Sequence, residues 1–143
     1  MTTNAMISNL LVEVAAAVVS PQTYDTLEEV IDFPSMGETA PLEDVTHFQS
    51  TSREYIGGLP DGDEFTIQCN RVHTASSTQT KMETYKALTK LFRVTETDTA
   101  VSPITTKVHT FSAVVLGWSY GPAVGSRATI SYSCKITGGV TTV

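Results

Sequence analysis

The side chains best suited to catalysis or metal binding are three histidines and two cysteines, and their spacing favours neither chemistry. His47, His73 and His109 are separated by 26 and 36 residues, without an HxH or HExxH arrangement that would hold a metal. Cys69 and Cys134 lie far apart and lack CxxC spacing. We predict structural or surface histidines and buried free thiols, with a disulfide as the less favoured alternative. We expect no catalytic residues, no metal and no cofactor.

Other catalytic motifs are equally absent from the sequence. Residues 57–62 hold three glycines but lead into an expected strand, so no helix N-terminus follows that could receive a phosphate. The adjacent acids Glu28 and Glu29 would point to opposite faces of a strand, which disfavours a glycosidase-like pair. A Ser-His-Asp triad stays open, because its chain order is free. The residue patterns therefore give no support for an enzyme.

Length and composition indicate one globular domain. The chain has 143 residues, of which 41% are hydrophobic and 17% charged, which excludes a disordered chain and a coiled coil. Its net charge of -6 disfavours sequence-independent nucleic-acid binding, which needs a basic face. The apolar run 10–19 is too short to span a bilayer, and no basic residue precedes it as in a secretory signal. We expect a soluble protein made in a cytoplasm, without membrane insertion.

Alternation of apolar and polar residues predicts most of the strands. Residues 10–19 place Leu10, Val12, Val14 and Val18 on one face. The further predicted strands are 27–33, 63–72, 92–97, 107–120 and 128–136, with a turn at 98–103. Trp118, the only tryptophan, falls in a strand expected to be internal.

The period changes to that of a helix over residues 74–90. Met82, Tyr85, Leu88 and Phe92 are spaced along one helical stripe, and Ser76 or Ser77 is a candidate N-cap. We therefore expect one amphipathic helix of about three turns between two strands. The predicted fold class is all-β to α+β: an antiparallel β-sandwich or barrel of about seven strands flanked by one α-helix.

Residues 1–143 are expected to form a single domain with three irregular parts. These are a flexible arm at 1–7, a long interaction loop at 34–62 with a possible short strand at 45–48, and a C-terminal tail at 138–143. Loops as long as 34–62 are uncommon in compact domains and usually serve a function or become ordered on a partner.

Charge is divided unevenly along the chain. Residues 25–64 contain eleven acids and one arginine, a net charge of -10, whereas residues 65–143 contain eight bases and three acids, a net charge of +5. This asymmetry suits head-to-tail contact between copies of the chain. Dipolar scatter over a solvated surface is an equally good explanation at this stage.

The segment 44–67 carries the most specific pattern, a Ser-Arg-Glu-Tyr-Ile run followed by Gly-Leu-Pro-Asp-Gly and the start of a strand. It resembles the characteristic segment of the major tail tube proteins of long-tailed, non-contractile (siphovirus-type) bacteriophages. The matching positions are Asp44, Thr46, Ser52, Arg53, Glu54, Tyr55, Ile56, Gly58, Leu59, Asp61, Gly62, Glu64 and Phe65. The order of the remaining elements, over residues 8–138, is similar to that family as well.

The resemblance implies a tail-tube-like structural protein of the virion. Its subunits would form hexameric rings, assembled in the bacterial host cytoplasm and stacked into a tube that conducts DNA without specific binding. Implied partners are the tape-measure, tail terminator and distal tail proteins. The residues expected at the subunit or ring interface are Ser52, Arg53, Glu54, Tyr55, Ile56, Gly58, Leu59, Asp61 and Gly62. Those expected to face the lumen are Thr66, Gln68, Asn70, Thr129, Ser131 and Ser133.

Three alternatives stay open. Another tail component, such as a terminator, a distal tail protein or a secretion-tube protein, fits the same length. A β-sandwich binding module would have a similar number of strands. Tyr55 and Ile56 are alternatively ordinary core residues beneath a loop.

Overall fold

The computed structural model describes residues 9–15, 22–33, 35–73, 77–98 and 103–143. One helix, α1 (Thr78–Thr84), accompanies the strands β1 (Asn9–Ala15), β2 (Tyr24–Thr26), β3 (Val30–Asp32), β4 (Glu38–Thr39), β5 (Leu42–Asp44), β6 (Tyr55–Gly57), β7 (Asp61–Gly62), β8 (Glu64–Asn70), β9 (Thr89–Asp98), β10 (Thr105–Gly121) and β11 (Thr129–Thr142).

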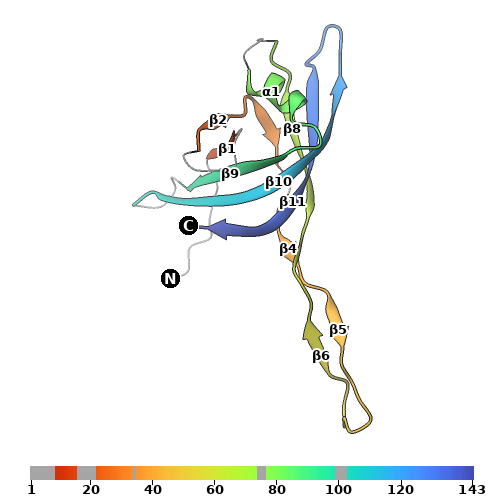
Figure 1. The fold of residues 1–143 in the computed structure, drawn as a ribbon. Coiled ribbons are helices and arrows are strands. Elements are labelled where there is room, and N and C mark those ends of the chain that lie inside the picture. Colours follow the sequence, from red (N-terminus) through yellow and green to blue (C-terminus); the bar gives the residue numbers. More distant parts are fainter. Residues whose placement is uncertain (1–8, 16–21, 34, 74–76, 99–102) are drawn as a thin grey trace.

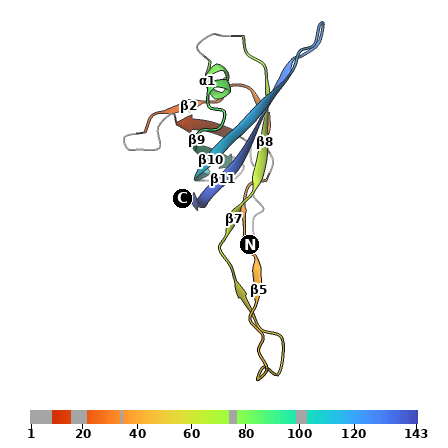
Figure 2. The same cartoon turned by 45° about the vertical axis from the view of Figure 1, so that its right-hand side comes forward.

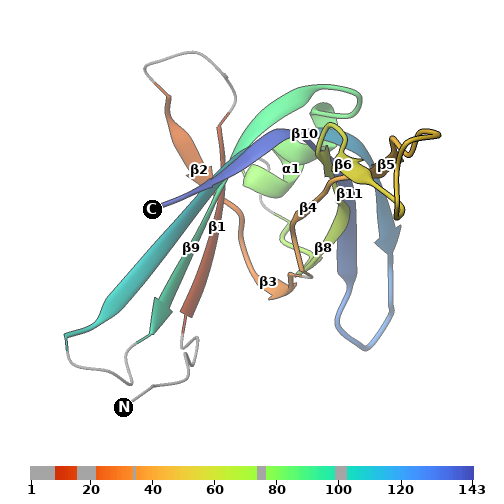
Figure 3. The same cartoon turned by 90° about the horizontal axis from the view of Figure 1, so that it is seen from below.

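Seven strands form one antiparallel sheet in the order β2-β1-β9-β10-β11-β8-β3. The sheet curls into a half-barrel, with α1 at one end of its hollow (Figure 1; Figure 3 shows the curl from below). This confirms the predicted fold class. The described part of the chain contains no helix with the length and hydropathy needed to cross a membrane.

The curl follows from the connection between β2 and β3, which lie at opposite edges of the sheet but are joined by three residues. Leu27 N–H donates to Val12 O (2.9 Å) at the first edge, and Asn70 N–H donates to Glu29 O (2.9 Å) at the other. Glu29 turns the chain with a φ of 50°. The predicted continuous strand 27–33 is therefore wrong, because the chain crosses between the two edges at Glu29.

The core fills the concave side, where the predicted alternation is confirmed for β8 and β11. In β1 the predicted alternation is not observed, because Glu13 and Ala15 are buried as well as Val12 and Val14. The Phe92 and Phe111 rings stack with centroids 5.7 Å apart, and Phe65 contacts both edge-on at 6.1 and 5.5 Å. Val12 and Val14 are buried beside them, whereas Leu10 is partly exposed. Val18 lies outside the described residues. Each buried apolar side chain of this size stabilises the fold by about 1.5–3 kcal/mol.

Cys69 and Cys134 are buried free thiols, as predicted. Cys69 pairs with Ile130 and Cys134 pairs with Phe65, so the two cysteines are four register positions apart on neighbouring strands. That separation is about 13 Å along the strand, too far for a disulfide. Burial raises the pKa of each thiol to about 12.

Helix α1 is shorter than predicted. Ser77 is its N-cap and accepts from Thr80 N–H, but the chain leaves the helix at Tyr85, and Ala87 has a φ of 65°. Ala87 N–H donates to Val115 O (2.7 Å), so pairing with β10 replaces the helix there and β9 begins at Thr89. Met82 and Tyr85 are buried as expected, whereas Leu88 is exposed and Phe92 belongs to β9. Residues 74–76 lie outside the described residues.

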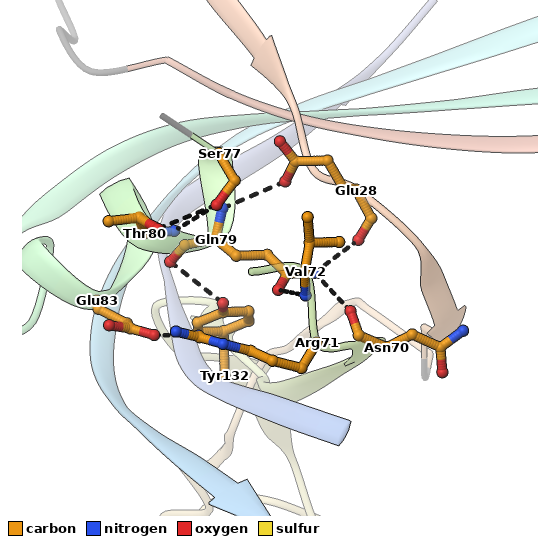
Figure 4. Close-up of polar contacts among 9 residues, drawn as sticks. All are labelled: Glu28, Asn70, Arg71, Val72, Ser77, Gln79, Thr80, Glu83 and Tyr132. Carbon is orange, nitrogen blue, oxygen red and sulfur yellow. Dashed lines mark hydrogen bonds and ion pairs between the residues drawn. The ribbon is translucent and has the colours of Figure 1, made fainter. Parts of the chain in front are cut away.

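The helix is fixed to the sheet by a polar network centred on the buried Gln79 (Figure 4). Its Nε2 donates to Glu28 O (3.0 Å) and to Asn70 O (2.7 Å), and its Oε1 accepts from Val72 N–H (2.9 Å). The Glu28 carboxylate accepts from the first helical N–H group, that of Thr78, at 2.8 Å. Every polar atom of the Gln79 side chain is thus satisfied, as burial requires.

The structure corrects the expectations for the C-terminal tail and for Trp118. The predicted tail 138–143 is largely strand: β11 runs to Thr142 and bends at Gly138, which has a φ of 79°. β10 is an internal strand of the sheet, as expected, but Trp118 on it is 46% exposed, because the ladder with β9 ends at Val114 and leaves that side of β10 without a neighbouring strand among the described residues. The predicted flexible arm 1–7 lies outside the described residues, as do residues 99–102 of the predicted turn.

Candidate assembly surfaces

The predicted loop 34–62 is largely a long β-hairpin that projects from the body (Figures 1 and 2). We call residues 38–62 the extension. At its base β4 pairs with β7, and further out β5 pairs with β6. The short strand expected at 45–48 is wrong, because the strand ends at Asp44 and residues 45–48 belong to the tip of the hairpin.

The base of the extension packs against β11 through close contacts. The backbone of Gly62 passes so near Ile136 that a Cβ built there would lie 2.5 Å from Ile136 O. Lys135 Nζ donates to Gly62 O at 3.0 Å and lies 3.5 Å from Asp61 Oδ2. On the other strand of the hairpin, the Glu38 carboxylate accepts from Val140 N–H. These contacts hold the extension at a defined position on the sheet.

The tip of the extension is organised by its own hydrogen bonds. Asp44 Oδ1 accepts from Thr46 N–H (3.0 Å), and its Oδ2 binds Arg53 Nη1 (3.1 Å). Ser50 Oγ donates to Glu54 Oε2 (2.6 Å) and accepts from His47 N–H (3.1 Å). The hydrogen bonds from Thr46, followed by that from Arg53, lower the pKa of Asp44.

Apolar side chains lie along both faces of the extension and have no core beneath them. The β5–β6 register places Leu42 and Tyr55 on one face and Ile56 on the other. All three are exposed, and Phe48 at the tip and Leu59 near the base are more exposed still, at 110% and 88%. An isolated two-stranded hairpin is at best marginally stable in water. Exposed apolar side chains gathered on one element are typical of interaction surfaces, so the extension is a candidate assembly surface.

The predicted interface residues all lie on the extension, but they differ in position. Ser52, Arg53 and Glu54 lie near the tip, where Arg53 and Glu54 bind groups of the extension itself. Tyr55 and Ile56 are exposed on β6, which contradicts the alternative that they belong to the core.

The remaining predicted interface residues lie toward the base of the extension. Leu59 and Asp61 are exposed, whereas Gly62 is buried against β11. A Cβ at Gly58 would lie 2.7 Å from Pro41 Cγ, so this glycine serves the hairpin's own packing. Interface contact by any of these residues stays a prediction.

The six predicted lumen residues form one contiguous polar surface. In the register of β8 and β11, Thr66 pairs with Ser133, Gln68 with Ser131 and Asn70 with Thr129. They lie on the face of the sheet turned away from the core, and the same surface continues onto β10 at Gly117, Ser119 and Gly121. We call the six side chains on β8 and β11 the polar sheet face.

The three histidines lie in separate parts of the described structure. Within the described ranges, no group of three or more His, Cys, Asp or Glu side chains is placed to bind a metal. His109 Nδ1 bonds Thr142 Oγ1 (2.8 Å) beside a cavity of about 590 Å³ with mostly apolar walls. His47 is exposed at the extension tip, and His73 is exposed after β8.

Two sets of contacts were not predicted from the sequence. Lys135 and Glu38 anchor the extension, and Gln79 fixes the helix. These contacts form because a strand register or a turn brings together residues that are distant in the sequence. The pattern of residue types along the chain contains no signal for such pairs.

Comparison with known proteins gives structural matches alone. No family model and no curated protein sequence matches the chain. A chain of the SPP1 tail tube structure aligns over 97% of this chain and 78% of its own length, with a TM-score of 0.68 and 11% identity. A chain in the tail of an empty GTA particle aligns over 94% and 95%, with a TM-score of 0.64 and 12% identity.

Contractile systems give similar matches. A chain in the PVC sheath/tube terminator, from an extracellular contractile injection system, aligns over 99% of this chain and 98% of its own, with a TM-score of 0.71 and 7% identity. The chain therefore has the fold of tail and tube components of phage-like particles. At these identities the likeness shows the fold alone.

Proposed function

We propose that this protein is a tube subunit of a phage tail or a phage-like particle, in which copies form hexameric rings that stack into a hollow tube. The observation that carries the proposal is the extension, an anchored hairpin with apolar side chains on both faces, on a fold shared with tail and tube components. A monomer would leave these side chains in water, whereas stacked rings bury them.

Hexameric symmetry is part of the proposal. The GTA tail was determined with C6 symmetry, and the matching AFP baseplate structure is 6-fold symmetrised. Both contain chains that align over more than nine tenths of this one. Six curled sheets arranged edge to edge would close into a barrel, which removes the exposed sheet edges.

The polar sheet face supports DNA conduction as the role of the tube. Its side chains are short or neutral hydrogen-bonding groups, and no Lys or Arg lies among the six. A lumen lined by such groups, in a chain with a net charge of -6, would let DNA slide without adsorbing. In the proposed particle the tube would contact the tape-measure, terminator and distal tail proteins, after assembly in the host cytoplasm.

A tube terminator is the second candidate, because the PVC terminator chain aligns over nearly the full length of both chains. A terminator forms one ring at the end of a tube, whereas a tube subunit polymerises. The two roles therefore differ in whether the purified protein elongates.

Negative-stain electron microscopy of concentrated protein, alone and with a tail initiator complex, tests the proposal. Tubes with sixfold symmetry are expected for the wild type. Tyr55→Ala and Leu59→Ser should remain folded monomers, and Ile104→Ser, which changes an exposed apolar residue outside the extension, should assemble normally. Single rings that never elongate would favour the terminator, and wild-type monomers under every condition would overturn the proposal.

A further inference from the structure

One edge of β10 is without a strand partner near the end of the molecule opposite the extension. The β9–β10 ladder ends at the Thr89–Val114 pair, followed by backbone bonds between Val115 and the residues Ala87 and Leu88. Residues 117–121, which follow this point along β10, pair with β11 on one side. Their other side has no partner among the described strands. Unpaired edges of this length invite pairing with another chain, and natural proteins usually cover them.

The surface around this edge is apolar and basic. Leu88, Trp118 and Val124 are exposed close to it in sequence, and Val124 is fully so at 106%. The two segments 77–90 and 116–129 contain Lys81, Lys86, Lys90 and Arg127 against the single acid Glu83, a formal net charge of +3. Within the subunit, Lys81 is paired with Asp25 and Glu83 with Arg71.

The extension is complementary to this surface. It contains five acids and one arginine, a formal net charge of -4, and it offers exposed apolar side chains. The extension and the β10–β11 hairpin project to opposite ends of the body (Figures 1 and 2). Copies stacked in the same orientation therefore bring the extension of one copy to the β10–β11 hairpin of the next.

We propose that β6 of one copy pairs, edge to edge, with residues 116–121 of β10 in a copy of the next ring. The inference rests on the proposed stacking of rings and names the surface that receives the extension. Pairing through β6 rather than β5 follows from their residues. Two of the three residues of β5 are the acids Glu43 and Asp44, whereas β6 offers the exposed apolar side chains of Tyr55 and Ile56 to the exposed apolar residues around the β10 edge. The charges of β5 then face the basic surface, and backbone hydrogen bonds provide the contact.

Crosslinking tests the pairing. Ile56→Cys protein is mixed with Ser119→Cys protein under assembly conditions and treated with a short bismaleimide, which tolerates a small register error. The native thiols are buried and should not react. Crosslinked dimers are expected in tubes and not in unassembled protein. The control pairs Ile56→Cys with Thr106→Cys, exposed near the other end of β10, and should give none.

Charge exchange gives a second readout. Lys86→Glu and Glu43→Lys should each slow tube growth by about tenfold, since each creates like-charge contacts between rings. The double variant should recover most of that loss. Lys107→Glu, exposed near the start of β10, is the matched control and should grow normally.

The outcomes separate the two proposals. Tubes that form without the Ile56–Ser119 crosslink, or single charge variants that grow normally, would overturn the β6–β10 contact and leave the tube function intact. Wild-type protein that never assembles would overturn both.

Discussion

Gly62 and Ile136 are in direct backbone contact: a Cβ on Gly62 would lie 2.5 Å from the Ile136 carbonyl oxygen and 2.7 Å from its Cβ. The extension therefore leaves the body at a point where only a glycine fits. Ile136 itself is a buried core residue of β11, and its N–H donates to Asp63 O at 3.1 Å. The position of the extension is in this way coupled to the packing of the core.

Replacing Gly62 by alanine should therefore destabilise the protein. Neither contacting backbone can move without disturbing the core, so we expect a loss of about 1–3 kcal/mol in the free energy of unfolding. Urea denaturation followed by circular dichroism measures it. Gly57→Ala is the matched control, because nothing lies within 4 Å of a Cβ there, and it should change stability by less than about 0.5 kcal/mol. Equal stabilities for the two variants would contradict this account of the base.

The body of the fold was predictable because each long strand buries one face. Phe65, Ile67 and Cys69 alternate with polar residues along β8, and Ile130, Tyr132 and Cys134 do the same along β11. The extension could not be predicted as a hairpin, since neither of its faces is buried in the subunit and its residues follow no alternation. Its role as an interface was only an expectation, based on the resemblance of segment 44–67 to tail tube proteins.

Gln79→Met should destabilise the protein although the two side chains are similar in size. The change leaves Glu28 O, Asn70 O and Val72 N–H without their partner inside the protein, and we expect a cost of about 2–4 kcal/mol. Thermal unfolding is the measurement. Thr84→Ala, on the exposed side of the same helix, should differ little from the wild type. If both variants melt together, the network does not fix the helix to the sheet.

The two cysteines should be unreactive in the folded protein. Burial raises the pKa of both thiols from 9.0 to about 12, which reduces the thiolate fraction at pH 8 by about three orders of magnitude. An aromatic disulfide reagent should therefore label neither cysteine in native protein and both after addition of guanidinium chloride. Fast labelling of native protein would mean that β8 and β11 separate readily.

The candidate site was predicted in outline but not in its internal structure. The resemblance led us to expect Arg53 and Glu54 at an interface, and the structure pairs them with Asp44 and Ser50 of the same hairpin. A contact that depends on how a hairpin folds back on itself cannot be deduced from residue types. By contrast, the polar sheet face follows directly from strand period, because Gln68 and Ser131 alternate with core residues and so must share a face.

The polar sheet face should become inaccessible to large reagents when tubes form. In unassembled protein, Ser131→Cys should react with a maleimide attached to a large polymer. In tubes, the large reagent should no longer reach this cysteine, whereas a small maleimide should still react with it. Lys107→Cys, exposed near the start of β10 and outside the proposed ring contact, is the control and should react with both reagents in either state. Equal labelling of Ser131→Cys by the large reagent in tubes would show that this face lies outside the tube.

Acid should loosen the tip of the extension. Hydrogen bonds from Thr46 lower the pKa of Asp44 below its usual 3.8, so the ionised carboxylate stabilises the tip at pH values above 3.8. That stabilisation is lost as the pH falls below 3.8 and through the lowered pKa, because the protonated carboxyl is a poorer acceptor for Thr46 N–H and no longer attracts Arg53. Asp44 is exposed, so the effect should be confined to the tip. The amide NMR shifts of residues 44–54, followed between pH 5 and about pH 2, should report this loosening of the tip. The control is Asp44→Asn, which cannot ionise and should lack the shift change at the Thr46 amide that depends on Asp44. A wild-type Thr46 amide that stays unchanged over this range would show that the carboxylate does not hold the tip.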